Sequence, residues 1–185
     1  PVFFKAMNLT LVHERDIGPE LDKKIITGLC TCFPYVQASF SVTRAWHNSV
    51  PSWSLYLEEN SHIILHVGVV DRTIRIGDQL VRVAGMQNVF VLPEYRGKGL
   101  CDVLMKDAMN KAAEFTYDYG FLFCIPEIEK VYRRCGWSKL PNMSIVRVDE
   151  SGQESVLSSK NIVMYYPLAK SEFPEGQIHL QGNDW

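Results

Sequence analysis

A short basic segment with two glycines, RGKG at residues 96–99, follows an apolar run that ends at Pro93 and precedes a helical pattern that begins at Leu100. Glycines let the backbone approach a ligand closely and direct successive N–H groups into one concavity. The helix dipole adds partial positive charge at this point, and Arg96 and Lys98 add full charges. The segment therefore suits a pyrophosphate group, and the alternative is a solvated basic turn.

The common phosphate-binding motifs do not fit this segment. A P-loop requires G-x-x-x-x-G-K-[ST], and Lys98 lacks both the upstream glycine and the neighbouring hydroxyl. A dinucleotide fingerprint requires G-x-G-x-x-G, but Gly97 and Gly99 are followed by Leu-Cys-Asp. A basic glycine turn between a strand and a helix is what remains.

Other kinds of active site have little support in the sequence. The two closest cysteines are spaced C-x-C, and the five histidines form no H-E-x-x-H or similar cluster. No serine lies in a G-x-S-x-G motif. We therefore expect no metal site and no serine-hydrolase chemistry.

Hydrophobic periodicity predicts one mixed α/β domain over residues 1–185. Gly77 and Asp78 indicate a hairpin turn, and Gly85 indicates a bulge or a close approach inside a strand. Residues 34–51 are expected to be a loop or a short irregular helix, and residues 151–160 a polar loop. The expected strands cover residues 8–14, 53–59, 62–76, 79–92, 119–125, 144–150 and 161–168, and the expected helices cover 19–33, 100–114 and 127–135.

Composition limits the range of partners. The chain is 46% hydrophobic and 22% charged with a formal net charge of −2, which argues against sequence-independent nucleic-acid binding. The longest apolar runs, such as IILHVGVV at residues 63–70, are too short to span a bilayer, and the first ten residues lack the pattern of a signal peptide. Five cysteines without framework spacing fit a reducing compartment. We therefore expect a cytoplasmic protein with no nucleic-acid or membrane partner.

Two segments together resemble the GNAT superfamily of N-acyltransferases. Residues 89–108, VFVLPEYRGKGLCDVLMKDA, contain the pattern Arg/Gln-x-x-Gly-x-Gly/Ala at Arg96, Gly99 and Cys101, with cysteine as a departure in the last position. Residues 131–137, VYRRCGW, are similar to the Tyr-x-x-x-Gly-aromatic segment after the fifth strand of these enzymes. The resemblance implies the GNAT fold, a central, mostly antiparallel sheet with a splayed parallel strand pair and flanking helices.

The resemblance also implies acetyl-CoA as the acyl donor. In that family the pantetheine arm pairs with the free edge of the strand before the glycine loop, as a peptide would. Tyr132 is at the position of the tyrosine that protonates the leaving thiolate, and the N–H of Val89 is the expected oxyanion donor. The implied cofactor-binding residues are Val89, Phe90, Val91, Arg96, Gly97, Lys98, Gly99, Leu100 and Cys101.

The general base and the acceptor stay open. Gln87 is at a position where relatives often carry glutamate, and an amide cannot take a proton, so a water chain or an acceptor amine of low pKa are alternatives. Aromatic residues could line an acceptor pocket, although such residues more often pack in the core. These aromatic residues are Tyr35, Phe40, Trp46 and Trp53.

Over most of its length the chain resembles the branch that holds aminoglycoside 2′-N-acetyltransferases and nodulation acyltransferases. The shared features are the hairpin of residues 66–85 and the ending FPEGQIHLQGNDW. The resemblance gives Trp185 a catalytic role, because its carboxylate, with Asp184, would place negative charge beside an ammonium-bearing acceptor.

The function expected first is transfer of an acetyl group from acetyl-CoA to an amine of a small polar molecule, with a homodimer as a further expectation. The alternatives are a longer acyl donor, a protein amine as acceptor, and a non-catalytic acyl-CoA sensor, which the amide at Gln87 favours.

Overall fold

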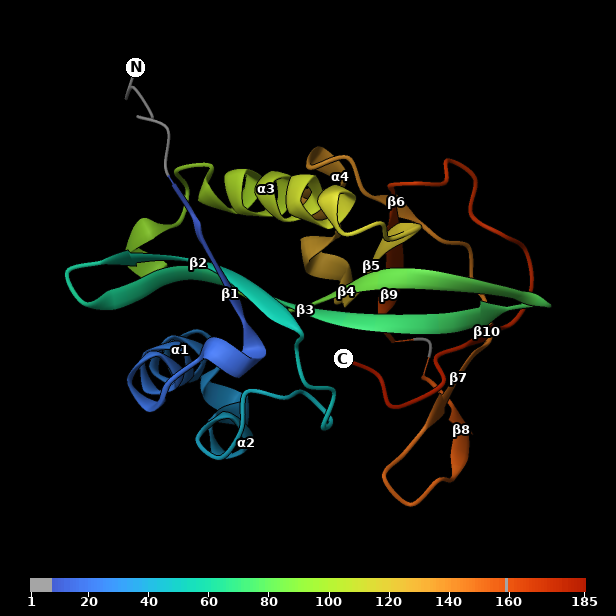
Figure 1. Cartoon of the computed structure of the whole chain (residues 1–185), viewed down its shortest axis with the longest axis horizontal. Helices are drawn as coiled ribbons and strands as arrows, with labels where there is room; N and C mark the ends of the chain where they lie inside the picture. Colours follow the sequence, from blue (N-terminus) through green and yellow to red (C-terminus); the bar gives the residue numbers. More distant parts are fainter. Residues whose placement is uncertain (1–7, 159) are drawn as a thin grey trace.

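The long hairpin that the sequence predicts is the central feature of the computed structural model, which describes residues 8–158 and 160–185. Strands β3 (His62–Ile76) and β4 (Gln79–Val91) pair antiparallel, and Gly77 has a φ of 54° in the turn between them. Figure 1 shows this hairpin extending through the length of the molecule. It is the common support for the segments on both faces.

Within the described residues, ten strands form one sheet around the hairpin. The order is β6-β9-β5-β4-β3-β10-β7-β8, and β2 pairs with the first part of β3 and with β1. Most neighbours are antiparallel, but β4 pairs with β5, and β10 with β7, in parallel. The remaining strands are β1 (Thr10–His13), β2 (Trp53–Glu59), β5 (Tyr119–Cys124), β6 (Ser138–Lys139), β7 (Ile145–Val148), β8 (Glu154–Val156), β9 (Ile162–Pro167) and β10 (Ile178–His179).

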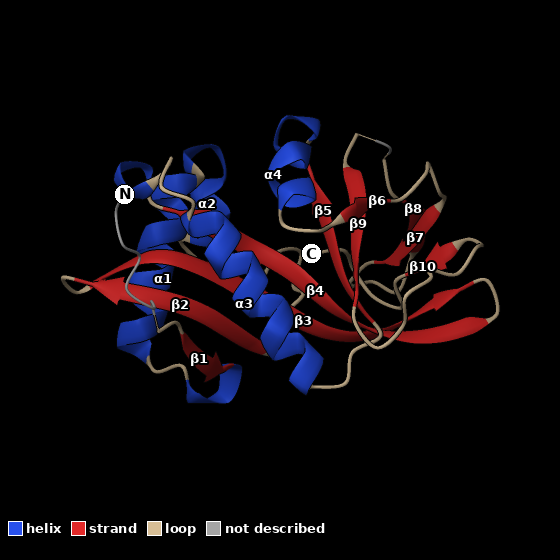
Figure 2. Ribbon diagram, turned by 90° about the horizontal axis from the view of Figure 1, so that it is seen from above, coloured by secondary structure: helices blue, strands red, loops and turns tan. Residues whose placement is uncertain are grey.

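Helices cover both faces of this sheet. Helices α1 (Pro19–Cys32) and α2 (Gln37–Phe40) lie on one face, and α3 (Leu100–Glu114) and α4 (Glu129–Arg134) lie on the other (Figure 1). Seen from above, α3 crosses the hairpin diagonally (Figure 2). Single 3₁₀ turns occur at Glu14–Asp16, Pro34–Val36, Pro93–Tyr95 and Pro126–Ile128.

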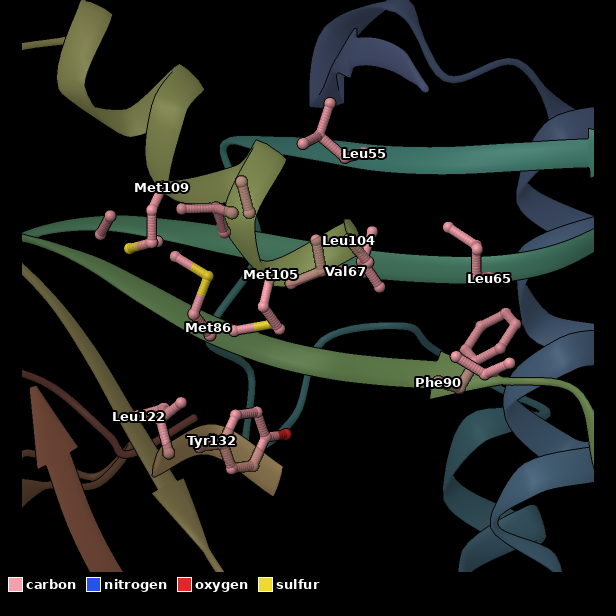
Figure 3. Packing of buried hydrophobic residues seen from close by; sticks show 14 of the residues in the cluster. Leu55, Leu65, Val67, Met86, Phe90, Leu104, Met105, Met109, Leu122 and Tyr132 are labelled. Atoms are coloured by element: carbon pink, nitrogen blue, oxygen red, sulfur yellow. The ribbon is translucent and has the colours of Figure 1, made fainter. Parts of the chain in front are cut away.

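Helix α3 packs because its apolar residues recur at helical spacing. Leu104 and Met105 are fully buried against the hairpin, and Met109 lies one turn further on (Figure 3). Burial of this face is the main stabilising contribution of such a helix. The same packing fixes the position of the glycine loop, which leads directly into the first turn of α3.

A second apolar cluster lies at the other end of the hairpin. It joins β3 and β4 to β5, β7, β10 and the tail, and includes Ile74, Phe121, Leu180 and Trp185. The tail therefore contributes to a core, as its apolar residues and turns suggested.

The predicted fold class is confirmed: a mostly antiparallel sheet with a parallel β4–β5 pair and flanking helices. The sequence missed β6, β8 and β10, which are two or three residues long. Residues 151–160 were expected to be only a loop, but β8 forms there because β7 supplies a partner strand. Strands this short have too few residues to show an alternating pattern.

Among the described residues, none of the helices combines the length and the apolar character needed to cross a membrane. Across the same residues, no three His, Cys, Asp or Glu side chains come together as metal ligands.

Candidate active site

The site begins where β4 and β5 separate. Their parallel pairing runs from Val83 opposite Tyr119 to Met86 opposite Leu122 and then stops. Beyond that point β4 stays paired with β3, while β5 stays paired with β9. Among the described residues, one edge of β4 is therefore without a partner strand over residues 87–91.

A bulge in β4 lies at this separation. Asn88 and Val89 stand opposite the single residue Val67, and Asn88 has a φ of 55°. The Asn88 carbonyl accepts a hydrogen bond from Nδ1 of buried His66 at 2.9 Å, and its side-chain amide donates to the carbonyl of Arg44. These contacts fix the bulge, and with it the direction of the Val89 backbone.

A cavity of about 240 Å³ occupies the space between the separated strands. Tyr35, Phe40 and Trp46 form part of its wall, as three of the four aromatic predictions proposed. Trp53 follows the other alternative: it is buried in the core, and its indole N–H donates to the hydroxyl of Tyr117. The other lining residues are Phe33, Met86, Gln87, Asn88, Val89, Leu122, Phe123, Cys124, Ile125, Ile128, Tyr132, Asn161, Asp184 and Trp185.

Tyr132 enters this cavity from α4. Its side chain is 7% exposed and lies beside Leu122 at the place where β5 leaves β4 (Figure 3). Burial, and then the neighbouring thiols, raise the pKa of Tyr132 well above the usual value for a phenol. The hydroxyl therefore stays protonated at neutral pH and can act only as a proton donor or hydrogen-bonding group there.

The glycine loop has the backbone geometry that its composition predicts. Gly97 and Gly99 have φ values of 75° and 76°, a region that side chains with a Cβ rarely adopt. Within the described residues, the amides of residues 97–101 donate to no protein acceptor, and an ideal Cβ on either glycine meets no atom within 4 Å. The loop thus presents free donors to an open space.

A second cavity of about 350 Å³ borders this loop. Arg96 and Arg134 both line it, and Arg96 also donates to the carbonyl of Val91 at 2.9 Å. Arg134, which the sequence analysis did not single out, forms two hydrogen bonds of 2.7 Å with Asp102. The charge of Arg134 is therefore held at the loop, next to the first turn of α3.

Seven of the nine predicted cofactor residues line one of the two cavities. Val89 lines the first cavity, and Val91, Arg96, Gly97, Gly99, Leu100 and Cys101 line the second. Phe90 directs its ring to the other side of β4, where it stacks on His66. The Lys98 ammonium lies over the ring of Tyr95 and donates to the carbonyl of Glu94, so its side chain does not line the loop cavity.

Gln87 has a structural role in this arrangement. Its side-chain oxygen accepts from the N–H of Trp46 at 3.1 Å, and its amide donates to the carbonyl of Ser49 at 2.5 Å. The amide thus attaches the loop of residues 44–49 to β4. A glutamate could accept the first of these bonds but could not donate the second.

The tail completes the wall of the first cavity. The Trp185 indole is 5% exposed, contacts Phe121 and Phe123, and has the guanidinium of Arg72 5.1 Å from its ring centre. It packs on Gly85, where an ideal Cβ would lie 2.4 Å from the indole. The close approach that Gly85 suggested therefore involves the tail.

Asp184, next to Trp185, is engaged on both of its carboxylate oxygens. One accepts from Arg147 at 2.8 Å, and the other lies 2.9 Å from Nδ1 of His47. Asp184, Phe123 and Asn161 also line a third cavity of about 340 Å³, which is shared with β7 and β9. Space for a second molecule therefore adjoins the first cavity.

The thiols at the site are not activated. Burial raises the pKa of both Cys101 and Cys124 to about 11. A thiol, rather than a thiolate, is present at neutral pH, and the thiolate is the nucleophilic form. Neither residue is suited to forming a covalent acyl-enzyme.

Comparison with known proteins agrees with this geometry. A family model described as an acetyltransferase (GNAT) domain matches residues 15–140. A comparison with curated proteins finds no match.

Several solved structures are similar to the chain. The acetyltransferase of Brucella melitensis described as a GNAT family member in complex with acetyl-CoA is 16% identical with a TM-score of 0.61, over 93% of this chain and 95% of that one. The Escherichia coli GNAT family N-acetyltransferase YhbS in complex with CoA is 14% identical with a TM-score of 0.63, over 96% and 92%. Escherichia coli ElaA is 12% identical with a TM-score of 0.62, over 86% and 98%. At these identities the likeness is one of fold.

Proposed function

The chain belongs to the acetyltransferase (GNAT) domain family, and from this premise we propose that it transfers an acetyl group from acetyl-CoA to a primary amine of a small polar acceptor. The observation that supports the proposal most directly is the separation of β4 from β5 beside two successive cavities. Val89 lines the first cavity and Val91 the second, so the free edge of one strand borders both.

The pyrophosphate, the extended arm and the thioester of acetyl-CoA match, in this order, the second cavity, the open edge of β4 and the first cavity. The free amides of residues 97–101, with Arg96 and Arg134 beside them, provide donors and positive charge for a pyrophosphate. The open edge of β4 provides backbone groups for an extended, amide-containing arm. Bound acetyl-CoA supplies a thioester carbonyl as the electrophile, and this order places it in the first cavity, near Tyr132.

Each proposed catalytic residue has a separate task. The N–H of Val89, fixed by the bulge, would donate to the oxygen that gains negative charge. Tyr132, kept protonated by burial, would give its proton to the leaving sulfur. Because Cys101 and Cys124 are held as thiols, we propose direct transfer to the amine without a covalent enzyme intermediate.

The acceptor would bind from the third cavity, which meets the first at Asp184 and Asn161. Its lining includes the polar residues Asn142 and Ser158 and the charged residues Glu129 and Lys139. We propose a polar amine, and more specifically a place in the branch of aminoglycoside 2′-N-acetyltransferases and nodulation acyltransferases. The docked tail, in which Asp184 lines both the first and the third cavity, supports that placement.

A longer acyl donor is favoured by one further observation. Tyr35, Ile125 and Ile128 are exposed apolar residues, and all three line the first cavity. Exposed apolar surface of this kind often marks a ligand-binding groove. Turnover compared across acetyl-, butyryl- and octanoyl-CoA at one fixed acceptor concentration would show whether these residues accommodate a longer chain.

The experiment that tests the proposed function is release of free CoA thiol from acetyl-CoA in the presence of an amine panel. The panel comprises ethanolamine, putrescine, kanamycin, tobramycin and a peptide with a free N-terminus. Amine-dependent thiol release is expected with at least one small polar amine. Calorimetric binding of CoA without release by any amine would favour the sensor instead, to which the amide at Gln87 is suited.

A further inference from the structure

A histidine–aspartate pair adjoins the first cavity, which Asp184 lines. Nδ1 of His47 is 2.9 Å from one carboxylate oxygen of Asp184, while Arg147 donates to the other at 2.8 Å. The Asp184 side chain is 13% exposed and that of His47 is 42% exposed. One partner is therefore held inside the protein and the other reaches solvent.

The backbone on both sides of the pair is fixed. The Ser49 hydroxyl donates to the Asp184 carbonyl at 2.8 Å, and the N–H of Ser49 bonds to the carbonyl of Trp46 across a four-residue turn. His47 and Asn48 form the tip of that turn, with φ values of 45° and 58°. Histidine and asparagine are among the non-glycine residues that adopt this conformation most readily, so the turn fits its sequence.

The orientation of the ring determines which nitrogen is available. A carboxylate only accepts hydrogen bonds, so Nδ1 carries the proton and Nε2 of the neutral ring has a free lone pair. Among the described residues, no protein group bonds to Nε2. Trp46 packs on the ring at 4.9 Å between ring centres, and both Trp46 and Asp184 line the first cavity. The ring therefore contacts two residues that line that cavity.

We propose that His47 is the general base that deprotonates the acceptor ammonium, with Asp184 as its positioning residue. This rests on the proposed function, which lacks a base because Gln87 is an amide committed to the backbone of residues 46–49. Asp184 holds the tautomer and stabilises the imidazolium that forms. Asp184 is thus a partner of the base and not a free carboxylate that binds the acceptor directly.

The proton balance closes with the residues at the site. Nε2 of His47 takes one proton from the ammonium, and the freed lone pair forms the C–N bond while the C–S bond breaks. Tyr132 gives its proton to the sulfur and regains one from the attacking nitrogen through water. His47 then releases its proton to solvent, so an ammonium and a thioester become an amide, a free thiol and one proton.

The charged groups around His47 come from three elements. Arg147 on β7 and Arg72 on β3 lie on the side of Asp184, and Glu150 accepts a hydrogen bond from Asn48 beside His47 in the turn.

The test uses the panel amine with the highest kcat/KM and the variant His47→Asn. Asparagine adopts positive φ and keeps a donor for Asp184, but it cannot take a proton. We expect kcat/KM to fall by about a hundredfold to ten-thousandfold with unchanged CoA affinity and melting temperature. The remaining rate should rise by roughly tenfold per pH unit, because only the neutral amine then reacts. The wild type should instead depend less steeply on pH, because His47 can take the proton from the ammonium itself.

Two further variants separate a base from a structural contact. His47→Gly suits the backbone and leaves room for imidazole, so added imidazole should restore part of its rate. His62→Gln removes an exposed histidine outside the site and should leave the rate unchanged. Wild-type kcat/KM in His47→Asn, or no rescue of His47→Gly, would overturn the assignment. A wild type inactive with the whole panel would instead refute the proposed function itself.

Discussion

Tyr132 combines deep burial with access to the cavity between β4 and β5. Burial is the main reason that its pKa is raised, and the nearby thiols add to the effect. A proton donor for a thiolate must stay protonated until the sulfur leaves, and this environment ensures that it does. A phenol that is already protonated can give a proton but cannot take one from the acceptor, so Tyr132 is suited to be the acid and not the base.

Tyr132→Phe is therefore expected to lower kcat by about a hundredfold to ten-thousandfold with nearly unchanged affinity for acetyl-CoA. The ring is retained, so its packing on Leu122 should persist. Steady-state kinetics and calorimetry would measure the two effects. Tyr166→Phe, a tyrosine on β9 that does not line the cavity, is the matched control. Equal turnover in the two variants would remove Tyr132 from the mechanism.

His66 holds the bulge from inside the core. It is fully buried, and desolvation lowers its pKa from 6.5 to about 4, despite the hydrogen bond to Asn88. The unfolded chain binds a proton near pH 6.5 that the folded chain does not accept until about pH 4. Stability from neutral His66 is thus fully present above about pH 6.5 and decreases as the pH falls toward 4.

We expect the free energy of unfolding to lose roughly 3 kcal/mol from this group between pH 7 and pH 4. His66→Gln keeps a donor for the Asn88 carbonyl but does not titrate, so it should be less stable at pH 7 with a flatter pH dependence. Urea unfolding of both proteins at several pH values gives the difference. Parallel curves for the two proteins would show that His66 does not titrate in this range.

At the scale of the elements, the glycine loop depends on backbone conformation more than on side-chain charge. Gly99 precedes α3 with φ at 76°, whereas the Lys98 ammonium is bonded within its own turn. The free amides face the cavity only while the glycines keep their positive φ angles. The loop should therefore tolerate the loss of a lysine better than the addition of a branched side chain.

Gly99→Val is expected to weaken CoA binding more than Lys98→Ala does, because a β-branched residue is strained at positive φ. Gly99→Asn serves as the matched control, since asparagine adopts this region more readily. Calorimetry with CoA would rank the three variants. If Lys98→Ala showed the largest loss, charge rather than backbone geometry would determine binding.

The elements with strong local patterns could be predicted from the sequence. The hairpin, α3 and the glycine loop have regular periodicity or distinctive turn residues, and all three form where expected. The direction of the Lys98 side chain could not be predicted, because it depends on the position of Tyr95 in a 3₁₀ turn. The His47–Asp184 pair joins residues 137 positions apart, and nothing in either local segment indicates the other.

At the scale of the whole molecule, the tail of residues 173–185 connects the third cavity, where the acceptor is proposed to bind, with the second apolar cluster. The chain passes from β10 along β7 and brings Trp185 against β4, at the last residues before β4 and β5 separate. Arg72 donates to the carbonyl of Asn183, which fixes the tail to β3 as well. The position of Asp184 at the cavity therefore depends on packing at Gly85, a residue that does not line the cavity.

A double-mutant cycle tests this dependence. In Gly85→Ala the new Cβ would lie 2.4 Å from the Trp185 indole, which cannot move freely because Phe121 and Phe123 enclose it. We expect a loss of about 1–3 kcal/mol from overpacking, while Trp185→Ala should cost about 3–5 kcal/mol. Once the indole is absent, Gly85→Ala should cost little, so the two effects should be non-additive by about 1–3 kcal/mol.

The cycle has a functional consequence that urea unfolding alone would not show. In Gly85→Ala the displaced tail carries Asp184 away from His47, so the KM for the acceptor amine should rise and kcat should fall, while CoA affinity at the distant glycine loop is retained. Gly18→Ala is the control, because its Cβ would meet no atom within 4 Å and it lies outside the tail. Additive stabilities together with unchanged acceptor kinetics in Gly85→Ala would contradict packing of Trp185 on β4 as the means by which the tail reaches the site.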